Sequence, residues 1–349
     1  MADATEGMNP RATEGTEITE RLLALIAGCR GKRVVVFGDL IADEFVYGRI
    51  ARVSREAPVL ILEYDATEVV PGGAGNAANN VASLGGTVRL VSLVGRDEAG
   101  WRLFKVLPRS VERAGLTRPG GYRTPVKTRI LAGGIHSAKQ QVVRIDRYAS
   151  EKVSDRHRAA AERAAKRAIK DADAVLISDY GSGLVQPRFV AELAASLRGR
   201  KKRVPILIDS RYALTRYRGL TACTPNESEV EQVLGVKIDD SKSVLERAGR
   251  TLLKRTRMSS VLITRGSRGM ALFEPGVPTV HIPIFGSDQI ADVTGAGDTV
   301  MATMTLALAA GASFEDAARL ANYAGGLVVM KRGTATVSAA ELRRAIVHG

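Results

Sequence analysis

The run Arg33-Val-Val-Val-Phe-Gly-Asp39 is apolar, rich in β-branched residues and ends in Gly-Asp. This pattern is typical of a parallel strand that is buried on both faces of a sheet. Similar runs follow at Ala174-Val-Leu-Ile-Ser-Asp179, Val204-Pro-Ile-Leu-Ile-Asp209 and Ser260-Val-Leu-Ile-Thr264, and helical patterns lie between them at 156–170, 187–197 and 242–254. The alternation predicts an α/β fold with a doubly wound, mostly parallel central sheet and helices on both faces. Functional groups in such folds collect at the carboxyl ends of the strands.

Two segments break this alternation. Residues 44–64 and 122–148 alternate between apolar and polar side chains in the manner of strands. They predict extra antiparallel strands, inserted into the α/β core, that form a small β-sheet lid over the active edge; an extension of the main sheet is the alternative. Residues 1–16 lack periodicity and predict a disordered tail. This leaves 17–349 as a single domain, which begins with a helix at 18–26.

Composition limits the class of protein. The chain has 349 residues, with 51 Lys and Arg against 37 Asp and Glu, and a formal net charge of +14. Its two cysteines cannot build a disulfide framework, no apolar run approaches the roughly 20 residues that span a bilayer, and the polar start is unlike a secretory signal. We therefore expect a soluble, cytoplasmic protein without a membrane partner. Because no aromatic run is interleaved with the basic residues, we expect no nucleic-acid partner either, and part of the positive charge would serve a phosphate site.

The strongest motif is Asp292-Val-Thr-Gly-Ala-Gly-Asp298, which precedes a helical run at 299–310. The glycines let the backbone turn tightly, so that the amides of Gly295, Ala296 and Gly297 would point into open space at the positive end of the helix. Such a nest suits a phosphoryl group in transfer, and Asp298 can accept the proton of an attacking hydroxyl. We expect the helix terminus to keep this carboxylate ionised. The alternative is a tight turn in which Asp298 only caps the helix.

The second motif, Pro71-Gly-Gly-Ala-Gly-Asn76, runs into a helical pattern at 77–84. Adjacent glycines at Gly72 and Gly73 allow a substrate to approach the backbone, and Asn76 offers a donor and an acceptor to a sugar hydroxyl. The stretch from Gly73 also fits the dinucleotide fingerprint G-x-G-x-x-A of nicotinamide-dependent oxidoreductases. That fingerprint should directly follow the first strand, which is better placed at 34–39, so this alternative is the less favoured one.

Two further motifs are ambiguous by themselves. In Thr224-Pro-Asn226-Glu-Ser-Glu229, an amide and a carboxylate three residues apart share one face of a helical turn. They can hold a hydrated magnesium ion beside phosphates, but they also fit a plain capping box. Thr264-Arg-Gly266-Ser-Arg-Gly269 is a glycine turn between strands expected at 260–264 and 270–273, and it fits an ordinary hairpin as well.

Together these motifs resemble the two signatures of the ribokinase-like (PfkB) family of sugar kinases, which match Gly72–Asn76 and Asp292–Asp298 in order and at the expected distance. The resemblance extends from about residue 31 to the end of the chain. It implies a ribokinase-like fold, ATP with Mg²⁺, Asp298 as the base and Gly295 to Gly297 as the anion hole. For the nucleotide it implies Asn226, Glu227, Ser228, Glu229, Thr264, Gly266, Gly269 and Asn322, with Glu229 holding the metal through water. For the sugar it implies Asp39, Asp43, Gly72, Gly73, Asn76 and Asp179.

Within this family, the expected lid is similar to that of the D-glycero-β-D-manno-heptose 7-phosphate kinases. The matching stretches are Arg52-Val-Ser-Arg-Glu-Ala-Pro58, Lys127-Thr-Arg129, Gln140-Gln-Val-Val-Arg144-Ile-Asp146 and Ser178-Asp-Tyr180. A kinase for a phosphorylated sugar needs cations at the distal phosphate. The candidates are Arg55, Lys127, Arg129 and Arg144, with a solvated lid strand as the alternative. Ser182 stands where members of that subgroup often carry Lys, which leaves the exact sugar open.

The resemblance therefore implies ATP-dependent phosphorylation of the anomeric hydroxyl of heptose 7-phosphate. The alternatives are another sugar or sugar-phosphate kinase of the family and, outside the enzymes, a non-catalytic sugar-binding module. Many heptose kinases also carry a nucleotidyltransferase domain, but this chain ends about fifty residues after Asp298 and has no H-x-G-H motif. We therefore expect at most the kinase half, with a separate nucleotidyltransferase acting downstream. The resemblance also suggests a homodimer through the lid and leaves activation by a monovalent cation open.

Overall fold

A computed structural model describes residues 10–133, 139–148, 153–286 and 292–348 of the chain. Among them, nine strands form the main sheet in the order β13-β12-β11-β10-β9-β8-β1-β4-β5, and four form a second sheet in the order β3-β2-β6-β7. The main sheet consists of β1 (Arg33–Gly38), β4 (Thr87–Leu93), β5 (Val111–Thr117), β8 (Ala174–Asp179), β9 (Ile206–Ser210), β10 (Ala222–Cys223), β11 (Ser260–Thr264), β12 (Met270–Phe273) and β13 (Val280–Ile282). The second sheet consists of β2 (Leu40–Val53), β3 (Leu60–Gly73), β6 (Val126–Gly133) and β7 (Gln140–Arg147). The helices are α1 (Pro10–Gly28), α2 (Ala74–Ser83), α3 (Glu98–Val106), α4 (Asp155–Ala168), α5 (Pro187–Arg198), α6 (Glu227–Leu234), α7 (Lys242–Thr256), α8 (Ala296–Ala310), α9 (Phe314–Val329) and α10 (Ala339–His348).

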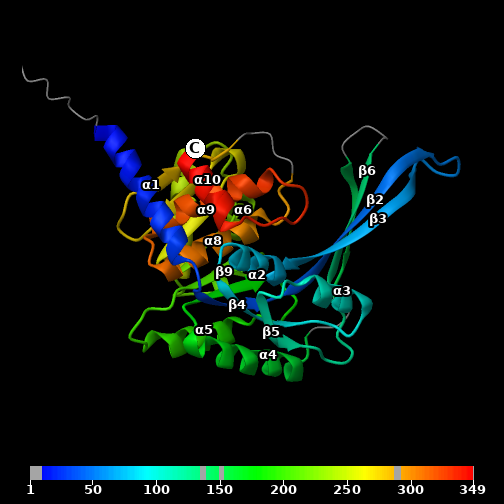
Figure 1. Ribbon diagram of the computed structural model, residues 1–349, viewed down its shortest axis with the longest axis horizontal. Coiled ribbons are helices and arrows are strands. Elements are labelled where there is room, and N and C mark those ends of the chain that lie inside the picture. The colour runs from blue at the N-terminus through cyan, green and yellow to red at the C-terminus, as the bar shows by residue number, and fades with distance from the viewer. Residues whose placement is uncertain (1–9, 134–138, 149–152, 287–291, 349) are drawn as a thin grey trace, which may run out of the picture.

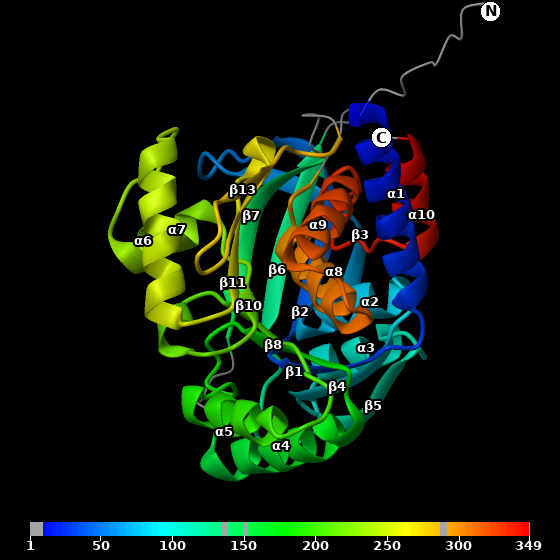
Figure 2. The same ribbon diagram turned by 90° about the vertical axis from the view of Figure 1, so that its left-hand side faces the viewer.

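Helices cover both faces of the main sheet, as Figures 1 and 2 show. Side chains of α1, α2, α8, α9 and α10 pack against one face, and those of α4, α5 and α7 pack against the other. Along β1, Val34 and Val36 belong to the first core, whereas Val35 and Phe37 belong to the second. All four side chains are buried, which is why the strand is apolar at every position. The predicted doubly wound α/β class is confirmed.

The main sheet is parallel from β5 across to β11 and antiparallel only at its other edge, where β12 and β13 are added. The carboxyl ends of the parallel strands therefore lie along one edge. The turn from Thr264 to Gly269 does join two antiparallel strands, β11 and β12, as the hairpin interpretation expects. This hairpin belongs to the same edge of the sheet, so the two interpretations of that motif do not exclude each other.

The second sheet projects from the carboxyl edge of the main sheet, on the right in Figure 1. It is separate from the main sheet, so the alternative of a simple extension is wrong. It also differs from the expectation in two respects. The first segment spans 40–73 instead of 44–64, and the pairing of β2 with β6 is parallel, whereas β2 with β3 and β6 with β7 are antiparallel. Several apolar side chains of this lid are exposed, among them Val53, Val143 and Ile145.

Three helices begin earlier than the sequence pattern indicated. Helix α1 begins at Pro10, so residues 10–16 are helical and the prediction of a disordered tail is wrong for them; residues 1–9 lie outside the described part of the chain. Helix α2 begins at Ala74 and α8 at Ala296, both within the glycine motifs themselves. Among the described residues, no helix combines the length and apolar character that crossing a membrane requires.

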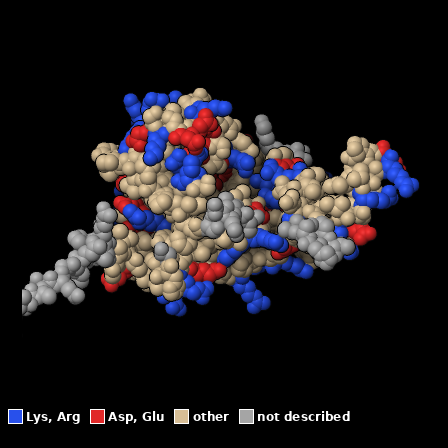
Figure 3. Space-filling model, turned by 90° about the horizontal axis from the view of Figure 1, so that it is seen from above, with Lys and Arg blue, Asp and Glu red and all other residues tan. Residues whose placement is uncertain are grey.

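Charged side chains are mixed on the surface that Figure 3 displays. Lys and Arg lie over the whole visible face, including the lid on the right, and Asp and Glu lie between them. Many are paired, as in the contact between Arg49 and Asp65 on the lid. Exposed pairs of this kind contribute little to stability.

Candidate active site

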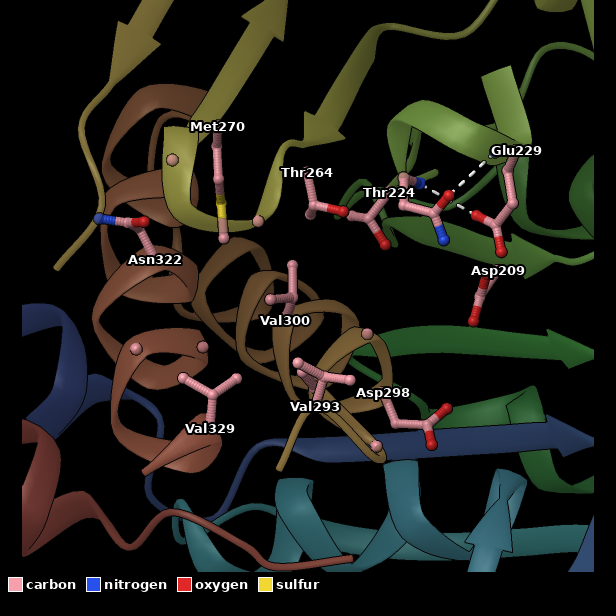
Figure 4. Close-up of a pocket in the computed structure, with 18 of the residues that line it drawn as sticks. Asp209, Thr224, Glu229, Thr264, Met270, Val293, Asp298, Val300, Asn322 and Val329 are labelled. Atoms are coloured by element: carbon pink, nitrogen blue, oxygen red, sulfur yellow. Dashed lines mark hydrogen bonds between the residues drawn. The ribbon is translucent and has the colours of Figure 1, made fainter. Parts of the chain in front are cut away.

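Two cavities lie along the carboxyl edge of the main sheet. The first has a volume of about 400 Å³ and the second about 390 Å³. Tyr180, just after β8, and Arg211, just after β9, line both of them. Figure 4 shows the first cavity, with Asp298, Asp209 and Glu229 on one side and Asn322 on the other.

The glycine motif before α8 forms one end of the first cavity. Gly295 is the N-cap and has φ of 79°, a left-handed conformation that favours glycine. The Ala296 N–H donates to the carbonyl oxygen of Val293 over 3.2 Å and closes a turn. The prediction that three amides point into open space is therefore wrong for Ala296. Among the described residues, no partner is found for the amides of Gly295 and Gly297, which lie at the positive end of the α8 dipole.

Asp298 is buried in the first turn of α8, but it does not cap the helix. Its carboxylate accepts hydrogen bonds from Asn76 Nδ2 at 2.9 Å and from the Tyr180 hydroxyl at 3.2 Å. Burial raises its pKa to about 7, against the hydrogen bonds of Asn76 and Tyr180, which lower it. The helix terminus, which we expected to keep this carboxylate ionised, is therefore opposed by desolvation. A pKa near neutrality suits a general base better than a low one.

The second glycine motif contributes a residue, Asn76, that donates a hydrogen bond to Asp298. Asn76, on α2, donates to Asp298 and to the carbonyl oxygen of Gly295, and its own amide oxygen accepts from Asn80. These contacts engage both N–H donors of Asn76 within the protein, and its contact with a sugar hydroxyl stays a prediction. At Gly72, a Cβ would lie 2.2 Å from the Asp43 carboxylate, so this glycine makes room for an acid of the lid.

The predicted magnesium motif lies at the N-terminus of α6 and lines the first cavity. Asn226 and Glu229 form a capping box: the Asn226 side chain accepts from the Glu229 amide, and Glu229 accepts from the Asn226 amide at 3.0 Å. Burial raises the pKa of Glu229. Glu227 does not line the cavity but pairs with Arg265, and Ser228 donates to Asn226.

The rest of the first cavity is lined by a glycine-containing hairpin, one amide side chain and several apolar side chains. Three predicted nucleotide residues, Thr264, Gly266 and Gly269, line it at the β11–β12 hairpin, and Asn322 lines it from α9. Asn322 donates to the carbonyl oxygen of Pro283 over 2.8 Å, which fixes its amide. The apolar part of the lining is formed by Met270, Ile284, Val293, Val300 and Val329.

The second cavity lies between the lid and the main sheet and is rich in cations. Two predicted residues, Lys127 and Arg144, line it together with Arg147 and Arg211. Two acids line it as well: Asp146, which pairs with Arg144, and Asp39, which accepts from the backbone amides of Tyr180 and Ser182 and from the Ser182 hydroxyl. Burial raises the pKa of Asp39 to about 6.

Seven predicted sugar residues line neither cavity: Asp43, Gly72, Gly73, Asn76, Arg129, Asp179 and Arg55. Asp43 and Arg129 form a buried ion pair of 2.7 Å, with 8% and 11% of their side chains exposed. Asp179 is buried and accepts from Ser210 and Tyr217, which fits a role in holding the sheet edge together. Arg55 is exposed in the turn that joins β2 to β3 at the far end of the lid.

Several cavity residues were not predicted from the sequence. They are Tyr180, Asp209, Arg211, Thr224, Arg147 and Ser182. Tyr180, Arg211 and Thr224 directly follow the last residue of a parallel strand, and Asp209 is the last residue but one of β9. The rule that sites form at the carboxyl ends of strands could therefore have found them.

Comparisons with known proteins agree with this geometry. Residues 32–341 match the pfkB family carbohydrate kinases. The chain is 40% identical to a bifunctional protein HldE of Trichlorobacter lovleyi over 316 residues, which are 90% of this chain and 62% of that protein. It is 41% identical to the bifunctional protein HldE of Geobacter metallireducens, over 91% of this chain and 64% of that one. It thus spans less than two thirds of these relatives.

Solved structures with the same fold include Arabidopsis thaliana ribokinase complexed with ribose and ATP, at a TM-score of 0.65 and 20% identity. This similarity covers 91% of this chain and 98% of the ribokinase. Phosphofructokinase-2 from Escherichia coli in complex with fructose-6-phosphate has a TM-score of 0.69 at 17% identity, over 91% and 99% of the two chains. At these identities the similarity shows the ribokinase-like fold alone. The family match over most of the length establishes more: the chain belongs to the pfkB family of carbohydrate kinases and acts as a phosphotransferase on a sugar hydroxyl.

Proposed function

We propose that this kinase transfers the γ-phosphoryl group of ATP to the anomeric hydroxyl of D-glycero-β-D-manno-heptose 7-phosphate. One observation supports this most: the cavity that holds Asp298 adjoins a second cavity lined by Lys127, Arg144, Arg147 and Arg211. A base at the end of one cavity and cations in the next suit a sugar that already carries a phosphate. The lid stretches that resemble heptose 7-phosphate kinases supply two of these four cations.

In the proposed reaction, Asp298 removes the proton of the anomeric hydroxyl as its oxygen bonds to the γ-phosphorus, and the bond from that phosphorus to the β-phosphate oxygen breaks. The products are ADP and the sugar 1,7-bisphosphate, and the proton stays on Asp298 until solvent takes it. The amides of Gly295 and Gly297 and the α8 dipole would stabilise charge on the transferred group. The apolar end of the first cavity, next to Asn322, would hold the adenine.

The residues on the Glu229 side of the first cavity, opposite Asn322, fit a magnesium ion. The Thr224 hydroxyl is buried without a hydrogen-bond partner among the described residues, and the half-buried carboxylate of Asp209 lines the same cavity. Burial raises the pKa of Asp209 well above its usual value, and the charge of Glu229 raises it further. These oxygen donors suit Mg²⁺, which keeps several waters and binds few protein carboxylates. When bound, the ion would neutralise the phosphates of the nucleotide.

Glu229→Gln is expected to shift activation to higher magnesium concentration without unfolding the protein. A glutamine oxygen can still accept from the Asn226 amide, so the cap survives, whereas the charge that attracts the ion is lost. The measurement is the initial rate against Mg²⁺ concentration at fixed ATP. Glu231→Gln, on the same helix but outside the cavity, is the control. A titration curve identical to that of the unaltered protein would leave Glu229 as a cap only.

Arg144→Ala is expected to raise the KM for the sugar phosphate about tenfold and to leave the KM for ATP nearly unchanged. A charge-assisted contact contributes about 1.5–3 kcal/mol, and Arg144 lines only the second cavity. Its ion pair with Asp146 holds the guanidinium in place over 2.8 Å. The matched control is Arg49→Ala, which removes an equally paired lid arginine outside both cavities. If the KM for ATP rises more than the KM for the sugar phosphate, Arg144 belongs to the nucleotide site and the assignment to the sugar phosphate is wrong.

We also propose partners for this activity. The exposed apolar residues of the lid, such as Val143 and Ile145, would be covered if two copies paired through their lids. The product, a sugar 1,7-bisphosphate, carries the anomeric phosphate that a nucleotidyltransferase uses, and such an enzyme would act downstream.

An ADP-release assay with matched pairs of free and phosphorylated sugars tests the proposed function. The proposal predicts that the heptose 7-phosphate gives the highest kcat/KM and that its unphosphorylated form is at least tenfold poorer, because a charge-assisted contact is lost. Faster turnover of a free sugar would favour the alternative of another sugar kinase of this family. ADP release from no sugar, together with sugar binding, would favour a non-catalytic module.

A further inference from the structure

Tyr180 contacts one charged residue of each cavity. Its hydroxyl donates to Asp298 over 3.2 Å, and the Lys127 ammonium lies 4.5 Å from the centre of its ring. It lines both cavities, from the loop that follows β8. The tyrosine therefore links the expected base to a cation of the sugar cavity.

The backbone around this tyrosine is fixed by Asp39. The Tyr180 amide donates to Asp39 over 2.8 Å, and the amide and hydroxyl of Ser182 donate to the same carboxylate. Gly73 lies close to the ring, because a Cβ at this position would be only 3.3 Å from Tyr180 Cε2. The Asp39 carboxylate and the absent side chain at Gly73 thus set the direction in which the phenol points.

We propose that Tyr180 is a positioning residue for phosphoryl transfer: its hydroxyl orients the Asp298 carboxylate toward the acceptor and favours its ionised form, while its ring seats Lys127 in the sugar cavity. This inference rests on the proposed role of Asp298 as the base. It separates two functions of one side chain, because the hydroxyl serves Asp298 and the ring serves Lys127.

The charges around Asp298 determine the expected direction of the effect. Asn76 faces it from α2, Asp43 and Lys127 from the lid, Tyr180 from the loop after β8, and Asp209 from the end of β9. Burial and the charge of Asp43 raise the pKa of Asp298, whereas the Asn76 and Tyr180 hydrogen bonds and Lys127 lower it. The Tyr180 phenol remains protonated and able to donate, because burial raises its own pKa well above the usual value. Removal of the hydroxyl should therefore raise the pKa of Asp298 further.

Tyr180→Phe is the variant that removes only the hydroxyl. We expect the acid limb of kcat/KM against pH to move up by about one unit, which is a tenfold loss on that limb and less than threefold on the alkaline plateau. The KM for the sugar should change little, because a phenylalanine ring still holds the Lys127 ammonium. Tyr180→Leu removes the ring as well and should also raise the KM for the sugar several-fold.

Tyr217→Phe is the matched control. Its hydroxyl donates to the buried carboxylate of Asp179 over 2.7 Å, and neither residue lines a cavity. Loss of this hydrogen bond should lower the thermal stability but leave the midpoint of the pH profile unchanged. An equal shift of that midpoint in Tyr217→Phe and Tyr180→Phe would show a general loss of structure and would overturn the proposal.

A second measurement needs no substrate. The folded-state pKa of Asp298 lies above the usual carboxyl value, so the free energy of unfolding should fall as pH rises from about 4 to 7 and then level off. Asp298→Asn lacks this dependence, and the stability difference between the two proteins follows the titration of Asp298. When Tyr180→Phe is added to both proteins, the difference between their free energies of unfolding should level off about one pH unit higher. An unchanged pH of levelling would overturn the inference. A shifted pH of levelling in a protein that phosphorylates no sugar would instead refute the proposed function and keep the coupling of Tyr180 to Asp298.

Discussion

Asp298→Asn is expected to slow turnover by about 10²–10⁴-fold in a protein that remains folded and still binds ATP. Asparagine keeps the size of the side chain and can still accept from Asn76 Nδ2, so the start of α8 should survive. What disappears is the proton acceptor. The amides of Gly295 and Gly297, which we propose as the anion site, remain, and one negative charge near the proposed position of the γ-phosphate is removed, so the affinity for ATP should change little.

The measurement is steady-state turnover combined with calorimetric titration of ATP and a thermal melt. Asp97→Asn is the control, because Asp97 is also an aspartate at a helix start but caps α3 through the Gly100 amide and lines neither cavity. Its turnover should stay close to that of the unaltered protein. If Asp298→Asn turns over within about threefold of that protein, the base lies elsewhere.

Gly295→Ala is expected to lower turnover by about 10²-fold or more and also to destabilise the fold. A Cβ at this position would lie 2.5 Å from Asn76 Nδ2, and the φ of 79° is unfavourable for alanine by about 1–2 kcal/mol. Relief of this clash must move either the anion-binding turn or the asparagine that holds Asp298. Loss of one preorganised donor alone typically lowers turnover by about 10²–10³-fold.

Gly297→Ala separates an effect on turnover from an effect on stability. A Cβ at Gly297 meets no protein atom within 4 Å, and its φ is not in the left-handed range, so this variant should not lower the melting temperature. Melting curves and initial rates of both variants measure the difference. A Gly295→Ala protein as stable and as active as the unaltered one would show that the turn tolerates a side chain and that its geometry does not matter for transfer.

The sequence was sufficient to predict the α/β class, the edge at which the site forms and the motifs that contribute to the first cavity. The apolar runs ending in Asp predict parallel strands, and their order along the chain fixes the edge at which a site forms. The residues of the two glycine motifs and of Asn226 to Glu229 lie at that edge because each stands in a short, local pattern. Local patterns of this kind can be recognised from the sequence, because they depend on the backbone conformation near the residue itself.

The contacts that are distant in sequence could not be predicted in this way. The link between Tyr180 and Asp298 joins residues 118 positions apart, and the pair of Asp43 and Arg129 joins residues 86 apart. The raised pKa of Asp298 has the same origin, because burial depends on the lid and on α2 as well as on α8. Arg129 was predicted as a phosphate ligand from its charge and from a stretch that resembles the heptose 7-phosphate kinases, whereas the fold pairs it with a buried acid.

The central claim is that Asp298 and the cationic cavity act together on a phosphorylated heptose, and the identity of the product tests it most directly. Enzyme, ATP, Mg²⁺ and D-glycero-β-D-manno-heptose 7-phosphate are incubated, and the product is examined by ³¹P NMR with coupling to the sugar protons. The account predicts one ADP per sugar and a new phosphorus signal coupled to the anomeric proton, both absent with Asp298→Asn. A new phosphate on any other carbon, or no phosphorylation of this sugar while a free sugar is converted, would contradict it.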